Sequence, residues 1–245
     1  MKILVINSNT SDLITQQIDV AAKMYANPGT QITAVSAASG PRSIEGEYDV
    51  ALSAIGSLQR LIALEKDYDG FVIACGSDPG LYACREVTSK PVVGIAEASM
   101  YMACLLGHRF SSLTALPRMV PQMEMLVKRY GLWERCASVR ATGAKVMEIA
   151  GDKERLLQAF IKEAKLAIEQ DGADVIALAG AAMVGMDKKI EEALGVPVTD
   201  GVVSAVKLVE AQVAYKLRPS KQTTFSFPEK KEAVNLDHLL LSVYK

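Results

Sequence analysis

Cys75 is the residue of this sequence best placed to do chemistry, because it directly follows an apolar run. Phe71-Val-Ile-Ala predicts a buried strand, and Gly76-Ser-Asp-Pro-Gly80 predicts a turn. Pro79 suits the first turn of a helix, so we expect a helix to start there. The backbone dipoles at such a position lower a thiol pKa, which favours a nucleophile or a base. The alternative is a small, inert, buried apolar residue, as free cysteines commonly are.

The segment around Cys75 has a counterpart later in the chain. Residues 69–81 align without a gap on residues 174–186, and each segment consists of an apolar strand followed by a turn of small residues. Pro91 and Pro197 continue the match with a shift of one residue. The repeat predicts two similar halves of one fold. Where one half has the thiol of Cys75, the other has Gly180 and no side chain.

The rest of the sequence alternates between strand and helix patterns, which predicts parallel, doubly wound sheets. The strand patterns cover residues 2–6, 31–36, 71–74, 110–114, 137–141 and 175–179, and the helix patterns cover residues 14–25, 49–64, 119–129, 153–169 and 201–217. We expect an α/β protein with two similar lobes, related by a pseudo-two-fold axis, and an active site in the cleft between them.

The expected division of the chain follows from the repeat. Residues 1–97 form the first lobe, which a C-terminal helix at residues 203–218 completes, and residues 98–202 form the second lobe. After Pro219 the periodicity is lost, so residues 219–245 are predicted to be a surface tail, with residues 236–244 as an apolar strip that can dock.

Composition narrows the class of protein. A net charge of −1 offers no footprint for nucleic acid or for an anionic membrane, so a small molecule is the expected partner. The first residues run straight into a strand, and no apolar run reaches the roughly 18 residues of a membrane span, so we expect a cytoplasmic protein. The four cysteines lack tight metal spacing and are expected to be free thiols. We predict neither a bound metal nor a cofactor. We expect the chain to form a homo-oligomer.

Ligands of open parallel sheets bind beyond the carboxyl ends of the strands. The segments at these ends are small or polar, and they are Asn7-Ser-Asn-Thr-Ser11, Gly40-Pro-Arg-Ser-Ile-Glu45, Cys75-Gly-Ser-Asp78, Thr114-Ala-Leu and Gly180-Ala-Ala. Their alternative role is structural, because such residues also cap helices and form turns. His108 is expected to be a loop residue, and turn formation is sufficient to explain Asp78.

Together these segments resemble the aspartate/glutamate/hydantoin racemase superfamily, and within it the hydantoin and allantoin racemase branch. The resemblance covers residues 1–221 and also includes Pro91-Val-Val-Gly-Ile, Arg109-Phe-Ser, Cys136-Ala-Ser-Val-Arg140 and Pro197-Val-Thr-Asp-Gly-Val202. It implies cofactor-independent proton transfer at a carbon next to a carbonyl, with one cysteine from each lobe on opposite faces of the substrate. By motif position Cys75 is the first cysteine. The residues implied to bind substrate are Asn7, Asn9, Ser43, Gly76, Ser77 and Thr114, to which we add Ala181 beside Gly180.

The sequence departs from this branch at the second cysteine, where it has Gly180, and after Cys75, where Gly76-Ser77 replaces the usual Phe-Gly. The leading hypothesis is therefore an isomerase of a hydantoin- or allantoin-like substrate with Cys75 as the surviving acid/base. A decarboxylase of the arylmalonate type is the second hypothesis, because protonation of a carbanion needs a single thiol. A ligand-binding member that has lost catalysis is the third.

Overall fold

Four parallel strands form the first sheet, in the order β2-β1-β3-β4. The computed structural model describes residues 1–143 and 153–244. The strands of this sheet are β1 (Lys2–Asn7), β2 (Gln31–Ser36), β3 (Gly70–Ala74) and β4 (Val92–Gly94), and the connecting helices are α1 (Asp12–Met24), α2 (Glu47–Leu64) and α3 (Leu81–Val87). The two central strands, β1 and β3, are buried from Ile3 and Gly70 onward, as their continuous apolar runs predict.

The second sheet repeats this arrangement in the order β6-β5-β7-β8. Its strands are β5 (Phe110–Thr114), β6 (Cys136–Ala141), β7 (Val175–Leu178) and β8 (Val198–Asp200), and the described helices between them are α5 (Val120–Arg129), α7 (Lys153–Asp171) and α8 (Asp187–Leu194). The two sheets correspond strand for strand, so β3 and β7 hold the same place in their sheets. The two-lobe α/β fold predicted from the repeat is confirmed.

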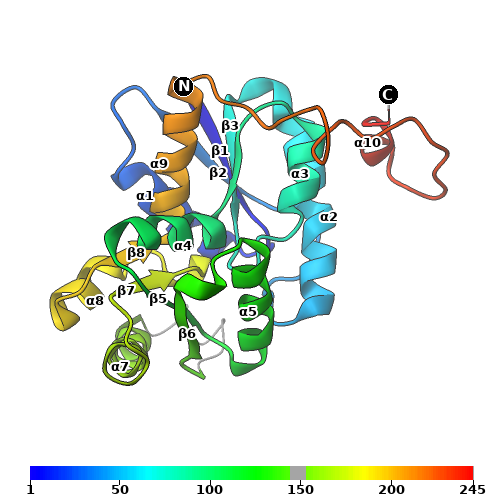
Figure 1. Cartoon of the computed structure of the whole chain (residues 1–245). Coiled ribbons are helices and arrows are strands. Elements are labelled where there is room, and N and C mark those ends of the chain that lie inside the picture. The colour runs from blue at the N-terminus through cyan, green and yellow to red at the C-terminus, as the bar shows by residue number, and fades with distance from the viewer. Residues whose placement is uncertain (144–152, 245) are drawn as a thin grey trace.

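Two helices each follow a strand of one sheet and pack against the other sheet (Figure 1). Helix α4 (Ile95–Leu106) follows β4 of the first sheet, but its Ala96 and Met100 pack against Phe110 of the second sheet. Helix α9 (Gly201–Ala214) follows β8 of the second sheet, but its Val202 and Val209 lie in the core beneath the first sheet. The sequence predicts this return of the last long helix, whereas the division of the chain at particular residues stays a prediction.

The helix after Cys75 begins later than predicted. It starts at Leu81 rather than Pro79, because the chain first passes through two left-handed residues, Asp78 with φ of 43° and Gly80 with φ of 74°. A proline can begin a helix only where its neighbours adopt the right-handed helical conformation, and the two residues that flank Pro79 do not. Cys75 therefore lies in a turn six residues before α3 and not at the helix start itself.

The residues after α9 extend over the first lobe, and Figure 1 shows them reaching the outer side of α2. Lys221 fastens this tail by donating to the carbonyl oxygens of Arg85 and Glu86, at 2.6 and 3.0 Å. The expected apolar strip contains one short helix, α10 (His238–Leu241), whose capping residue Asp237 accepts a hydrogen bond from Gln59 of α2. The segment before it stays open to solvent, with Val234 81 % exposed.

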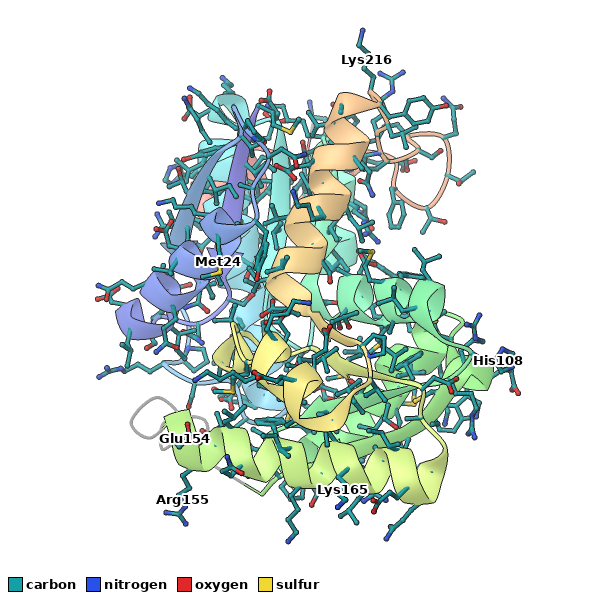
Figure 2. The ribbon with its side chains drawn as sticks, turned by 90° about the vertical axis from the view of Figure 1, so that its left-hand side faces the viewer. Met24, His108, Glu154, Arg155, Lys165 and Lys216 are labelled. Carbon is teal, nitrogen blue, oxygen red and sulfur yellow. The ribbon has the colours of Figure 1, made fainter. Side chains whose placement is uncertain are left out.

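The outer face of α7, on the second lobe, is charged. Along α7, the side chains of Glu154, Arg155 and Lys165 point away from the body of the protein in Figure 2, while Phe160 and Ala164 are fully buried beneath them. This is the amphipathic pattern that the sequence predicts for residues 153–169. Within residues 1–143 and 153–244, the chain contains no helix both long enough and apolar enough to cross a bilayer.

Candidate active site

Cys75 and Gly180 line one cavity at the carboxyl ends of the strands. Cys75 follows β3 directly, and Gly180 comes two residues after β7. Because β3 and β7 hold equivalent places in their sheets, the two residues approach the cavity from opposite lobes. The cavity has a volume of about 90 Å³, so its occupant must be a small molecule. This is where ligands of open parallel sheets bind.

Most of the predicted site residues lie at this cavity. Those that line it together with Cys75 and Gly180 are Asn9, Gly76, Ser77, Thr114 and Ala181. Asn7 and Ser43 do not line it. The buried amide of Asn7 donates to the Asn9 side chain and to Thr15 Oγ1, at 2.8 and 2.9 Å. Asn7 therefore shapes the loop that presents Asn9, and in the loop of Ser43 it is Ile44 that reaches the cavity.

Sequence reasoning missed Gln122 and most of the apolar wall. Gln122 lies on α5 and accepts a hydrogen bond from the Ser77 hydroxyl at 2.9 Å, which joins the two lobes beside Cys75. The apolar wall consists of Ile14, Ile44, Leu113, Leu116, Met119, Met123 and Met183. The helical period of residues 119–129 places Met119, Gln122 and Met123 on one face, but the sequence gives no sign that this face meets the other lobe.

The lobes meet closely at the two glycines of the cavity. A Cβ atom on Gly76 would lie 3.3 Å from the Cα atom of Gly180, a tight contact that explains why small residues stand here. A Cβ atom on Gly180 would lie 2.6 Å from Cε of Met183. The methionine thus fills the space that a side chain at position 180 would take, and this face of the cavity is apolar.

The predicted low pKa of Cys75 is wrong. Burial of the thiol and, as a smaller cause, the nearby carboxylate of Asp78 raise its pKa to about 12. Hydrogen bonding from Ser77, chiefly from its backbone amide, acts in the other direction but does not compensate. The dipole of α3 acts only weakly on Cys75, because the helix starts six residues later. The residue itself is partly exposed to the cavity, so a protonated thiol faces the ligand space.

This pKa predicts how Cys75 reacts with iodoacetamide. Only the thiolate reacts, so the alkylation rate of Cys75 should rise about tenfold for each pH unit between pH 6 and 9, without levelling off. Mass spectrometry of the modified peptide measures this rate. A plateau near pH 7 would show that the thiol is acidic and that the dipole outweighs burial.

The other cysteines and His108 lie away from this cavity. Cys84 is fully buried, and Cys104 and Cys136 pack against the core of the second lobe. All four cysteines are free. Burial raises the pKa of each of the other three thiols as well, so pKa does not single out Cys75, but its place at the cavity does. His108 is exposed at the periphery of the molecule in Figure 2, as expected of a loop residue.

Two repeated α/β lobes enclose a cavity that the thiol of Cys75 lines. Comparison with known proteins then identifies the family: residues 3–209 match the family model described as Asp/Glu/Hydantoin racemase. The chain belongs to this family, and it is an enzyme of the racemase type.

The most similar proteins agree with this assignment. The chain is 46 % identical over 235 residues to the hydantoin racemase of Pseudomonas sp. (strain NS671), a match that covers 96 % of this chain and 94 % of the relative. It superposes on the allantoin racemase from Klebsiella pneumoniae with a TM-score of 0.94 at 39 % identity, covering 100 % and 99 % of the two chains. Arylmalonate decarboxylase shares the fold alone, with a TM-score of 0.61 at 18 % identity and coverage of 87 % and 92 %.

Proposed function

We propose that this chain transfers a proton at the carbon next to a carbonyl of a hydantoin- or allantoin-like ring, with Cys75 as its acid/base. One observation carries the proposal: among the described residues that line the cavity, Cys75 alone has a titratable side chain. The names of the relatives support the substrate class, because the similar proteins are a hydantoin racemase and an allantoin racemase. Proton transfer by one positioned group is sufficient to exchange the hydrogen of such a carbon.

The polar residues of the cavity suit a ring that contains amides. Asn9, Ser77, Thr114 and Gln122 offer both donors and acceptors, and they come from both lobes. A cyclic ureide has alternating N–H and carbonyl groups that such side chains can pair. The charge that develops on the ring oxygen when the proton leaves is stabilised by donors fixed in advance, which is the larger part of the catalytic effect. The apolar wall, with Met119 and Met123, then receives the substituent of the reacting carbon.

Among the described residues, none that lines the cavity opposite Cys75 has a titratable side chain. Gly180 has no side chain, and Met183 covers the place where one would lie. A proton that Cys75 removes from one enantiomer therefore returns from the same side. We expect the chain to exchange that hydrogen with solvent faster than it inverts the carbon, and to prefer one enantiomer.

A decarboxylase is the second proposal, and the resting state of Cys75 favours it. With a pKa of about 12 the thiol is protonated at neutral pH, so it is ready to donate a proton and poorly prepared to remove one. Loss of carbon dioxide from a malonate leaves the electron pair of the broken carbon–carbon bond on the carbon, and one thiol proton completes the product. The likeness to arylmalonate decarboxylase supports the fold alone.

The experiment uses separate enantiomers of a 5-substituted hydantoin, allantoin and an arylmalonate, each incubated with the protein in heavy water. Proton NMR measures exchange at the reacting carbon, chiral chromatography measures inversion, and released carbon dioxide measures decarboxylation. Exchange that exceeds inversion supports the one-base proposal. Carbon dioxide from the malonate alone supports the second proposal. Binding without any reaction would reject both and leave a ligand-binding protein.

We also propose that the chain forms a homo-oligomer and works in the cytoplasm. Large apolar side chains on the surface support self-association, among them Leu105 at 80 % and Tyr48 at 77 % exposure. Four free cysteines suit a reducing compartment. Light scattering coupled to size-exclusion chromatography measures the mass of the particle, and a monomer at micromolar concentration would reject the first of these proposals.

A further inference from the structure

Asp78 is a buried residue with strained backbone that the proposed chemistry does not use. It is 6 % exposed, and its φ of 43° lies in the left-handed region that non-glycine residues rarely adopt. Its backbone amide donates to the carbonyl oxygen of Cys75 at 2.9 Å, which closes the turn that presents the thiol. A strained residue persists only where its surroundings hold it in place.

The Asp78 carboxylate caps α4, a helix to which it does not belong. Oδ1 accepts from the amide of Ala96 at 3.0 Å, and Oδ2 accepts from the amide of Glu97 at 2.9 Å. These are the second and third amides of the helix, which the side chain of the N-cap residue normally binds. The N-cap residue here is Gly94, which has no side chain to do so. A Cβ atom on Gly94 would lie 2.3 Å from Cγ of Asp78, so the carboxyl group takes its place.

The second lobe has a carboxylate at the equivalent position, but there the helix carries it and not the turn. Asp200 is the N-cap residue of α9, and its Oδ1 accepts from Val202 and Val203, again the second and third amides. Its Oδ2 accepts from the amide of Gly185, in the turn that follows Gly180. In the internal repeat, Asp200 corresponds to Gly94, and Met183 corresponds to Asp78. In both lobes a carboxylate thus joins the turn to the helix. In the first lobe the turn carries it, and in the second lobe the N-cap residue of the helix carries it.

A third hydrogen bond to the Asp78 carboxylate extends this link to the second lobe. Oδ2 of Asp78 also accepts from the hydroxyl of Tyr130 at 2.6 Å. Tyr130 ends α5 and is buried in the core of the second lobe. Helix α5 also carries Gln122, the partner of Ser77. The Cys75 turn is therefore tied at Ser77 and at Asp78 to the lobe that forms the opposite wall of the cavity.

We propose that Asp78 is a positioning residue: by capping α4 from within the Cys75 turn and binding Tyr130, it fixes the thiol relative to the second-lobe wall. Its effect on catalysis rests on the proposed role of Cys75, whereas its effect on the position of the thiol does not. Capping alone could be done by a side chain at position 94, as Asp200 does in the second lobe. The attachment of the carboxylate to the turn is the feature that needs explanation.

An exchange of the two residues separates positioning from capping. Asp78→Gly removes the carboxylate without backbone strain, because glycine accepts a left-handed φ. Asp78→Gly combined with Gly94→Asp returns the carboxylate to the same spot, now attached to the helix as in the second lobe. The charge near Cys75 is thus retained, and only its link to the turn is lost. Asp200→Ala is the matched control, since it removes the equivalent cap from the lobe without the thiol.

We expect Asp78→Gly to lower Tm by about 2–4 °C and the double variant to recover most of this loss. Hydrogen exchange of substrate should stay at least about tenfold below the unmodified chain in both, because displacements of about 1 Å are that costly. Alkylation of Cys75 should be about tenfold faster in the double variant and unchanged in Asp200→Ala.

Recovery of both exchange and the original alkylation rate by the double variant would overturn the proposal and leave Asp78 as a cap. If the unmodified chain exchanges no substrate, the proposed function fails, but alkylation still reports the position of the thiol. Tyr130→Phe serves if the double variant does not fold. It keeps Asp78 and its cap of α4 but removes the hydrogen bond from Tyr130 to Asp78. A Cys75 alkylation rate equal to that of the unmodified chain would equally overturn the proposal.

Discussion

Gly180→Cys is expected to raise the rate of inversion by about 10²-fold or more, while hydrogen exchange changes far less. The new thiol would lie across the cavity from Cys75 and supply a proton donor on the second face. Chiral chromatography of a hydantoin enantiomer measures inversion, and NMR in heavy water measures exchange in the same sample. With one base, the rate of inversion divided by the rate of exchange is low. In the Gly180→Cys variant this ratio should approach the value of a two-base enzyme.

The control is Gly180→Ala, which introduces the same Cβ atom and the same displacement of Met183 without a thiol. The new atom would meet Cε of Met183 at 2.6 Å, and the end of a methionine side chain moves at little cost. Gly180→Cys with Met183→Ala removes that contact if the single variant is impaired. Rapid inversion by the unmodified chain, or equal rates in the Cys and Ala variants, would contradict the one-base mechanism.

Cys75→Ala is expected to lower hydrogen exchange by about 10²- to 10⁴-fold, because Cys75 has the one titratable side chain among the described residues that line the cavity. Ligand binding should be kept, since the amide-pairing side chains remain, and calorimetry with a hydantoin measures it. Cys104→Ser is the matched control, because Cys104 is also partly exposed but packs outside the cavity. A Cys75→Ala variant that retains exchange would assign the proton transfer to another group.

The fold could be predicted because its strands are short, apolar and repeated. Residues 31–36 and 110–114 are strands with the predicted bounds, since both end at clear polar or small residues. Helix α4 was not predicted. Residues 95–100 are all buried, so the helix has no polar face and no amphipathic period to reveal it.

The site was predictable where a strand end delivers a residue directly and not where two lobes must meet. Cys75, Thr114 and Gly180 follow from strand ends in one sheet or the other. Gln122 reaches the cavity through helix packing against the opposite lobe, which local sequence does not encode. The pKa of Cys75 was mispredicted for the same reason: it depends on burial by residues distant in sequence, which outweighs the dipoles of its own turn.

The crossing of α4 and α9 has a consequence for synthesis on the ribosome. The apolar face of the first sheet, with Ile3 and Val72, is covered by Val202 and Val209 of α9, which are translated more than a hundred residues later. A nascent chain that ends at residue 150 therefore carries a complete first sheet, in which the part of this face that α9 covers is still open to water. Contacts this distant in sequence form slowly, and the uncovered surface invites aggregation. The first half of this protein should remain bound by chaperones until translation is nearly complete.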